Sequence, residues 1–322
     1  MIMKKKNNFD IRQLKVPLIL LIVFWVIAII FWQLKENIFF LFNFGYIGTS
    51  IGVGLGVYQI LPKKKKHWGR RLAQILVGTY MLVFLGIIKK ENMQIEGFFV
   101  YLLAGIFSGS TIHYLVAKLA GPVIFSRGWC GWSCWTAMIL DLLPFKRNKS
   151  GRLAGKWEFL RYVNFALSLG LILVLWVGFD QRIHSPIYAP LVWMLSGTIL
   201  YYTVGIVLAF ALKDNRAFCK YVCPIPVFQK IPSRFSMLKV EGSAEKCTGC
   251  GACDKMCPMD IQVSQYTQSH QRVLSTECIL CNQCVDVCTK DALKISFGFD
   301  FGNRELLNRK GSSLQPATEG RR

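Results

Sequence analysis

Long apolar segments separated by short polar connections dominate the first two thirds of the chain. Each is close to the roughly 20 residues that a membrane-spanning helix needs. Six such segments occur, at residues 16–32, 37–61, 72–88, 97–117, 161–179 and 187–212. A further stretch, 120–145, is apolar but broken by Gly-Pro, charged residues and two cysteines, which predicts a re-entrant or interfacial segment. The pattern predicts a mostly α protein built on a six-helix transmembrane bundle.

Basic residues gather in alternate connections between these segments. The connections at 62–71 and 146–161 each carry six Lys or Arg residues, and the N-terminus is basic as well. The connections between them hold few cations or offset them with Glu. The positive-inside rule therefore predicts a multi-pass protein of the bacterial cytoplasmic membrane, with both termini in the cytoplasm and the first helix uncleaved.

Composition and charge agree with a membrane protein. The chain is 53% hydrophobic, has a mean hydropathy of +0.37 and carries a net charge of +21. Residues 241–300 hold five basic and eight acidic side chains. The positive excess therefore lies in the connections of the apolar part, where topology explains it, and nucleic-acid binding is not expected.

Eight of the twelve cysteines form two copies of C-x2-C-x2-C-x3-C. This run ligates [4Fe-4S] clusters in bacterial ferredoxins, where the fourth cysteine of each run binds the other cluster. One predicted cluster is held by Cys247, Cys250, Cys253 and Cys288. The other is held by Cys278, Cys281, Cys284 and Cys257. Zinc remains an alternative, although zinc sites favour paired C-x2-C without the further cysteines.

The cysteine spacing also divides the chain into parts. Residues 1–237 form a predicted transmembrane domain, and residues 238–300 form a small α+β domain of the bacterial two-[4Fe-4S] ferredoxin type. Residues 301–322 lack periodicity and are expected to be a flexible tail. Because iron–sulfur clusters are built in reducing compartments, we expect the ferredoxin domain on the cytoplasmic side.

The other four cysteines form two C-x3-C pairs, Cys130 with Cys134 and Cys219 with Cys223. A spacing of four is one helical turn, so each pair is expected to present both sulfurs on one helix face. Both pairs fall at the predicted cytoplasmic end of the bundle and could hold a third iron–sulfur or redox centre. The alternative is that these buried cysteines act as small hydrophobic side chains.

Two ionisable residues are candidates for proton transfer to and from a quinol. Asp141 follows the first cysteine pair and lies close in sequence to Trp132 and Trp135, and His113 lies within the fourth apolar segment. A quinol site needs an apolar cleft, aromatic walls and a proton acceptor. The alternatives are ordinary aromatic anchoring at the membrane interface and a packed histidine.

The two C-x3-C pairs, the Pro after the second pair and the double ferredoxin run resemble the NapH-like family of polytopic membrane ferredoxins, which is related to NosR-type and CcoG-type membrane redox proteins. The resemblance covers about residues 72–297. It implies a quinol-linked redox step, with electrons passing through clusters to a redox protein or reductase subunit. In that family Pro usually follows each C-x3-C, whereas Trp135 stands there after the first pair.

We expect a protein that is embedded in membrane lipid and that transfers electrons between a quinone/quinol pool and a redox partner. An alternative is a factor for metal-centre assembly, in which the C-x3-C thiolates handle or reduce a metal such as copper and the ferredoxin domain supplies electrons. A purely structural anchor for another redox subunit is the third possibility.

Overall fold

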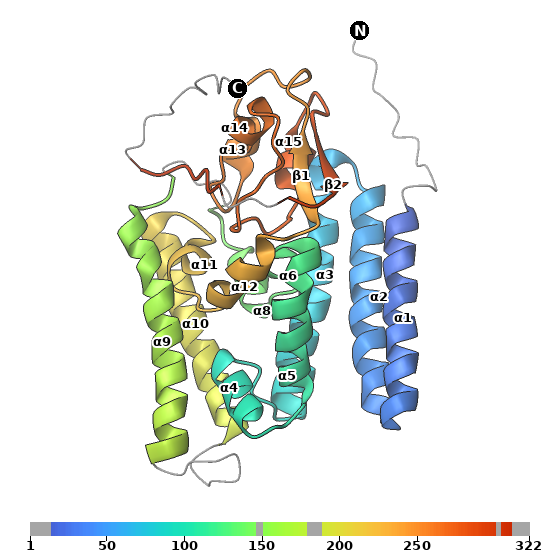
Figure 1. Cartoon of the computed structure of the whole chain (residues 1–322), viewed down its shortest axis with the longest axis vertical. Coiled ribbons are helices and arrows are strands. Elements are labelled where there is room, and N and C mark those ends of the chain that lie inside the picture. Colours follow the sequence, from blue (N-terminus) through green and yellow to red (C-terminus); the bar gives the residue numbers. More distant parts are fainter. Residues whose placement is uncertain (1–13, 146–150, 179–188, 301–303, 311–322) are drawn as a thin grey trace.

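The computed structural model describes residues 14–145, 151–178, 189–300 and 304–310. Long helices run side by side and carry the small cysteine-rich part at one end (Figure 1). Among the described residues, five helical stretches are long and apolar enough to cross a membrane: α1 (Lys15–Lys35), α2 (Ile38–Ile60), Lys63–Ile88, Gly155–Gly178 and α10 (Pro190–Leu212). They coincide with the first, second, third, fifth and sixth predicted segments.

Two of these stretches are composite. The third joins η2 (Lys63–Lys65), α3 (His67–Thr79) and the π-helical η3 (Tyr80–Ile88). The fourth joins η5 (Gly155–Phe159), α9 (Leu160–Leu173) and the π-helical η6 (Val174–Gly178).

Most of the outer helical surface is apolar. Only 11% of the most apolar part of α1 and 17% of that of α10 is buried inside the protein. Large side chains such as Ile19, Trp25 and Ile199 point outward and are exposed. Such a surface would associate in water, whereas lipid tails solvate it without cost.

The fourth predicted segment, 97–117, is not one helix. It divides into α4 (Ile95–Leu103) and a second helical run formed by α5 (Gly109–His113), η4 (Tyr114–Ala120) and α6 (Gly121–Phe125). Figure 1 shows α4 at the end of the bundle away from β1 and β2, and α6 at the end beside them. The prediction of a single span over 97–117 is corrected accordingly.

The break at the end of α4 has a local cause. Gly105 has φ +68, in the left-handed region. The Ile106 N–H donates to the Tyr101 carbonyl at 2.8 Å, and the Gly105 N–H donates to the Leu102 carbonyl at 3.2 Å. This pair of hydrogen bonds is a Schellman motif, which satisfies the last carbonyls of a helix and ends it.

Short helices lie at the end of the bundle that faces the cysteine-rich part. Two of them, α7 (Gly128–Trp132) and α8 (Trp135–Leu140), fall within the predicted re-entrant segment 120–145, whereas α11 (Ala217–Tyr221) and α12 (Pro226–Ser233) come later in the chain. The interruptions seen in the sequence at 120–145 therefore do break the chain into short elements, as expected.

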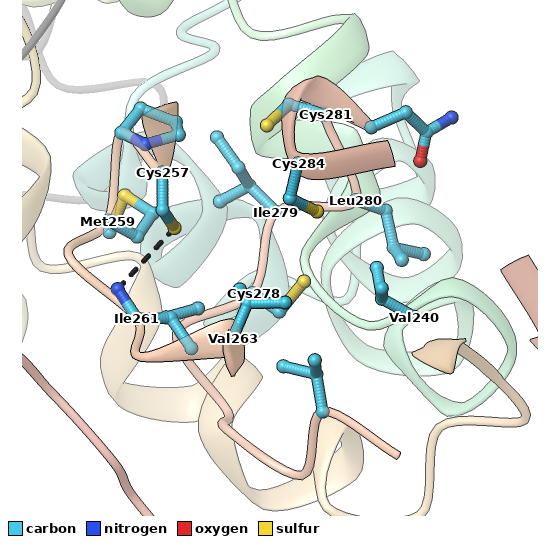
Figure 2. A pocket seen from close by; sticks show the side chains of 13 residues that line it. Val240, Cys257, Met259, Ile261, Val263, Cys278, Ile279, Leu280, Cys281 and Cys284 are labelled. Carbon is cyan, nitrogen blue, oxygen red and sulfur yellow. Dashed lines mark hydrogen bonds between the residues drawn. The ribbon is translucent and has the colours of Figure 1, made fainter. Parts of the chain in front are cut away.

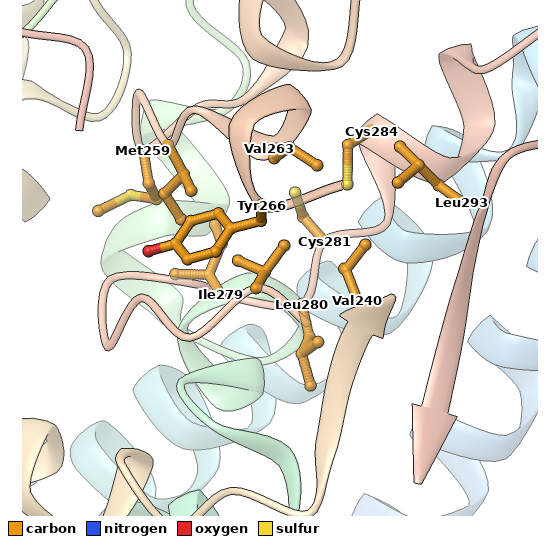
Figure 3. Packing of buried hydrophobic residues seen from close by; sticks show 11 residues of the cluster. Val240, Met259, Val263, Tyr266, Ile279, Leu280, Cys281, Cys284 and Leu293 are labelled. Atoms are coloured by element: carbon orange, nitrogen blue, oxygen red, sulfur yellow. The ribbon is translucent and has the colours of Figure 1, made fainter. Parts of the chain in front are cut away.

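The cysteine-rich part is a small α+β unit. It contains β1 (Leu238–Gly242), α13 (Ala252–Met256), α14 (Val263–Gln268), α15 (Gln283–Val287) and β2 (Leu293–Phe297). The two strands pair antiparallel, with Val240 opposite Ile295. Val240, Met259, Tyr266, Ile279 and Leu280 form its buried core together with cysteines, as Figure 3 shows.

Part of the predicted flexible tail is packed. Within residues 304–310, the Glu305 carboxylate accepts hydrogen bonds from the backbone and side chain of Thr276. Arg309 pairs with Glu158 at 2.8 Å. These polar contacts hold residues 304–310 against both the cysteine-rich part and the bundle. The remaining residues of the predicted tail lie outside the described residues.

We expect Gly105→Ala to destabilise the protein by about 1–2 kcal/mol, because an L side chain in the left-handed region carries that cost. An added Cβ at Gly105 would meet no other atom, so the backbone conformation alone sets the effect. Thermal unfolding in detergent measures it. Gly170→Ala, in α9 and equally open around its Cβ, is the matched control and should be neutral or stabilising. Equal melting temperatures for the two variants would contradict the assignment.

Candidate iron–sulfur site

The two cysteine runs adopt the same backbone conformation. Left-handed residues recur at matching places, with φ +68 at Gly249 and +45 at Leu280, and +65 at Gly251 and +61 at Asn282. Each run then enters a five-residue helix, α13 or α15, and the two helices pack together. The sequence repeat is therefore also a structural repeat. The strand before the first run, β1, pairs with the strand after the second run, β2.

The eight cysteines line two separate hollows. One hollow is lined by the inner group, Cys257, Cys278, Cys281 and Cys284, whose side chains are arranged around it in Figure 2. The other is lined by the outer group, Cys247, Cys250, Cys253 and Cys288. Each hollow takes three cysteines from one run and the fourth from the other, which is how a bacterial double ferredoxin holds its clusters. The donor set and the hollows therefore fit two clusters.

Backbone N–H groups point at the sulfur atoms in both groups. The Ile261 N–H lies 3.4 Å from Cys257 Sγ, and the Ala292 N–H lies 3.3 Å from Cys288 Sγ. Such hydrogen bonds stabilise thiolate ligands and help to set a cluster's potential. Burial raises the pKa of Cys278 to about 12, so a metal centre must displace its proton to bind there.

The arrangement does not suit one small ion. In the part of the chain that is described, no three His, Cys, Asp or Glu side chains are grouped as ligands of a single metal ion. A tetrahedral zinc site would hold its sulfurs ~3.8 Å apart, given Zn–S distances of about 2.3 Å. A cluster places each thiolate on a different iron and needs wider spacing, so the geometry favours clusters over zinc.

The two groups differ in their surroundings. In the inner group, Cys281 and Cys284 are buried. In the outer group, Cys250 is exposed to solvent. The inner group faces the bundle, and the outer group opens to the surface.

Each C-x3-C pair straddles the end of a short helix. Cys130 lies within α7, but α7 ends at Trp132 and Cys134 is the N-cap of α8. Cys219 lies within α11, and Cys223 follows the end of that helix. The expectation that each pair shares one helical turn is therefore wrong, because the helix stops between the two cysteines.

An arginine stands three residues before the first cysteine in both pairs, at Arg127 and Arg216, and each caps the short helix that follows. Arg216 Nη1 donates to the Cys130 carbonyl at 3.1 Å and lies 3.9 Å from Cys219 Sγ. The R-x2-C-x3-C spacing that the two pairs share is present in the sequence. The contacts of Arg216 join the two pairs into one site, which we call the membrane-face thiols: Cys130, Cys134, Cys219 and Cys223.

Buried cations surround the membrane-face thiols. Although burial opposes ionisation, Lys118, Arg127 and Arg216 lower the pKa of Cys130. Burial raises the pKa of Cys219 to about 11, and the neighbouring thiols Cys134 and Cys130 add to the increase. The four thiols thus share one electrostatic environment in which fixed positive charge can balance an anionic thiolate cluster.

Asp141 does not behave as a free proton acceptor. Its carboxylate is buried between Arg70 Nη1 at 2.9 Å and Arg216 Nη2 at 2.7 Å. Burial would raise its pKa, but Arg216 and Arg70 lower it to about 2. The carboxylate is therefore ionised and occupied at neutral pH, and the expectation that it accepts a quinol proton is corrected.

His113 lies beside the first cysteine pair. It is buried in α5, with its ring 4.9 Å from that of Trp129 and 6.0 Å from that of Trp135. Its Nε2 atom has no hydrogen-bond partner among the described residues. A histidine that contacts the two tryptophans flanking the first cysteine pair in the sequence remains a candidate for proton transfer.

The inner group packs directly on the first cysteine pair. The Cys278 carbonyl accepts hydrogen bonds from the Arg127 N–H at 3.3 Å and from Ser126 Oγ at 3.0 Å. Trp132 Nε1 donates to the Leu280 carbonyl at 2.9 Å. A Cβ at Gly131 would approach the Ile279 carbonyl to 2.2 Å, so only glycine allows this approach.

One carboxylate beside the inner group joins several elements. Glu277, which is fully buried, pairs with Arg127, Arg152 and Arg161 at 2.8–2.9 Å and with Lys230 at 2.8 Å. Burial opposes its ionisation, but the surrounding cations hold its pKa well below the usual range. No local pattern predicts this contact, because the residues lie far apart along the chain.

Comparison with known proteins agrees with the cysteine arrangement. A family model described as a 4Fe-4S dicluster domain matches residues 239–289, and one described as a 4Fe-4S binding domain matches residues 110–152 and 191–240. Ferredoxin-type protein NapH of Escherichia coli is 26% identical over 61% of this chain and 69% of its own length. The chain is thus similar to the NapH-like ferredoxin-type membrane proteins.

Other relatives extend the match. An uncharacterized protein of Methanocaldococcus jannaschii is 27% identical over 70% of this chain and 86% of its own length. The putative electron transport protein YccM of Escherichia coli is 30% identical over 54% and 52%. No solved structure matches significantly. The second family model includes both C-x3-C pairs, so the membrane-face thiols lie within matched segments.

We expect Glu277→Gln to destabilise the protein by about 3–5 kcal/mol, because it leaves several buried cations without a carboxylate. Denaturant or thermal unfolding of the purified protein measures the loss. Glu241→Gln is the control, since its ion pair with Lys294 is exposed and should be worth no more than about 1 kcal/mol. Similar losses in the two variants would show that Glu277 has no special part in the fold.

Proposed function

We propose that this membrane protein passes single electrons between quinol in the bilayer and a redox partner in the cytoplasm. A bound 4Fe-4S cluster supplies the one-electron chemistry. The chain's own residues hold the clusters, exclude water and fix the distances. The observation that carries the proposal is the direct packing of the inner group on the first cysteine pair, through the hydrogen bonds to the Cys278 carbonyl.

The contacts support a continuous route. The membrane-face thiols would hold one centre inside the bundle end, beside Arg127, whose carbonyl accepts the Cys130 N–H at 2.9 Å and whose guanidinium is ion-paired to Glu277. Glu277 precedes Cys278, which belongs to the inner group. The inner and outer groups share helices α13 and α15, and the exposed Cys250 lies on the surface that a soluble partner can reach. Either direction of flow uses the same contacts.

Contacts of the basic connections support the proposed orientation. Lys63 contacts the Cys288 carbonyl and pairs with Asp291, and Lys220 pairs with Asp260 at 2.5 Å. Connections that the positive-inside rule assigns to the cytoplasm thus touch the ferredoxin part. A cytoplasmic ferredoxin domain on an inner-membrane bundle satisfies both the charge rule and these contacts.

At the bundle end, His113 is the group proposed to accept the quinol proton. Its ring lies against Trp129 and near the membrane-face thiols, and its Nε2 atom is available among the described residues. Quinol oxidation releases two electrons and two protons, which leave one at a time. As each electron passes to the centre at the membrane-face thiols and on to the ferredoxin clusters, His113 would take one proton and release it to water before the next.

Replacing Cys130 and Cys219 with Ser tests the function. We expect quinol-dependent reduction of the ferredoxin clusters to fall by about tenfold or more, since each change removes a ligand of the proposed first centre. Reduction by dithionite, followed optically in the same samples, should persist and is the internal control. If quinol-dependent reduction survives while delivery of a metal such as copper to a partner fails, the metal-assembly function replaces electron relay.

The crossed ligand sets make a separate prediction. Cys257→Ser should perturb the same EPR signal as Cys281→Ser, because both residues line the inner hollow. Cys288→Ser should perturb the signal affected by Cys250→Ser. Anaerobic EPR with iron counting on the reduced full-length variants provides the measurement. Loss of the Cys250 signal in Cys257→Ser would mean that each run binds its own cluster instead.

A further inference from the structure

A large basic cleft lies between the η2–α3 turn and the ferredoxin part. It encloses about 1770 Å³ of space outside the atoms, including its open mouth. Its walls come from η2, α3, α15 and the turns around residues 141–145 and 214–216. Five Lys or Arg residues and three Asp residues line it. It adjoins both cysteine-lined hollows, sharing Pro258 with the inner one and Cys288 and Thr289 with the outer one.

The acidic residues of the cleft are already engaged. Asp141 is held between two arginines, as described above, and Asp214 pairs with Lys220 at 2.6 Å. Asp286 accepts a hydrogen bond of 2.6 Å from the Tyr58 hydroxyl. Asp141 engages two cations of the cleft, Arg70 and Arg216. Lys63 pairs with Asp291, so Arg71 and Lys64 are the lining Lys and Arg residues that have no carboxylate partner among the described residues.

Arg71 is a buried cation of the cleft that has no carboxylate partner in the described part of the chain. Its side chain is only 8% exposed, and one Nη2 hydrogen bond of 2.5 Å reaches the Asp141 backbone carbonyl. Its Nε has no hydrogen-bond partner, and Arg71 forms no ion pair, among the residues that the structure describes. A buried guanidinium in this state is costly unless an anion completes its surroundings. Lys64 lines the same cleft and is exposed.

The surroundings of Arg71 indicate where the anion comes from. Arg71 stacks 5.2 Å from the ring of Trp68, which is 53% exposed. The turn that carries Lys64 connects α2 with α3, and both belong to apolar stretches long enough to span a membrane. An exposed tryptophan beside cations at the end of a span is typical of the lipid–water interface. Cations at this level attract anionic lipid headgroups.

We propose that the basic cleft binds a phosphate group, held by Arg71 and Lys64, and that this phosphate belongs to the headgroup of an anionic phospholipid. A guanidinium offers two parallel N–H donors to phosphate oxygens, and the lysine adds charge at the mouth. Cys288 and Arg216 also line the cleft, but neither Arg71 nor Lys64 lies on the proposed electron route, so failure of the lipid experiment would leave the proposed function intact.

Native mass spectrometry of the full-length protein in detergent tests the proposal, with phosphatidylglycerol as the probe and phosphatidylcholine as the comparison. We expect wild-type protein to prefer phosphatidylglycerol, and Arg71→Gln and Lys64→Gln each to weaken its binding about fivefold, because each removes one charge near the headgroup. Lys65→Gln is the matched control, since Lys65 lies in the same turn but does not line the cleft. Its affinity should stay near that of wild type.

Further measurements keep the outcome unambiguous. Arg71→Lys retains the charge and should bind more tightly than Arg71→Gln, and unchanged iron content and absorbance show that each variant is folded. If inorganic phosphate alone binds wild type but not Arg71→Gln, and lipid does not, the phosphate site stands and its lipid source is overturned. If Arg71→Gln binds phosphatidylglycerol as wild type does, or Lys65→Gln loses as much as Lys64→Gln, the site itself is overturned.

Discussion

The buried carboxylate of Glu277 is the interaction on which the arrangement of the two parts depends. It belongs to the ferredoxin part, yet its partners come from the bundle side: Arg127 before α7, Arg152 after the predicted re-entrant segment, Arg161 in α9 and Lys230 in α12. Buried ion pairs add little net stability compared with apolar packing, but removing one member leaves uncompensated charge. Such a cluster therefore specifies position: the ferredoxin part can seat only where one carboxylate meets several cations. Because Cys278 follows Glu277, the same contact fixes the inner group against the membrane-face thiols.

Local sequence signals predict the parts of this protein better than their assembly. Apolar length identifies five of the helical stretches, because a run of about 20 apolar residues has few alternatives in a membrane. It fails at 97–117, where hydropathy does not report that Gly105 adopts a left-handed conformation and ends α4. The signal was present, since glycine is the usual residue at this place in a helix end. The packing of residues 304–310 had no such signal, because Glu305 meets Thr276 only after the ferredoxin part has folded.

Within the site as well, local spacing predicts the ligand sets, whereas long-range contacts escape it. The spacing of the eight ferredoxin cysteines predicts two four-cysteine sets, and the two hollows are lined by those sets. The C-x3-C spacing predicts a single helical turn for each pair, but spacing cannot reveal that α7 ends before Cys134. Asp141 was chosen for its position near tryptophans, and its role emerged only from contacts with Arg70 and Arg216, which lie about 70 residues away in each direction. Long-range ion pairs decide whether a carboxylate is a base or a structural anion, and sequence proximity does not report them.

The positive charge of the chain consequently has two physical roles. The positive-inside rule treats cations in the connections as a topological signal, yet several of them are wholly buried: Arg152, Arg161, Arg216 and Lys220 are at most 2% exposed. Buried cations near thiolate ligands offset the negative charge that an iron–sulfur cluster brings into a region of low dielectric. Arg127 contributes to this balance twice, because its charge lowers the pKa of Cys130 and it pairs with Glu277 beside Cys278. A change in charge at either centre is therefore felt at the same guanidinium, which makes Arg127 an electrostatic link between the bundle and the ferredoxin part.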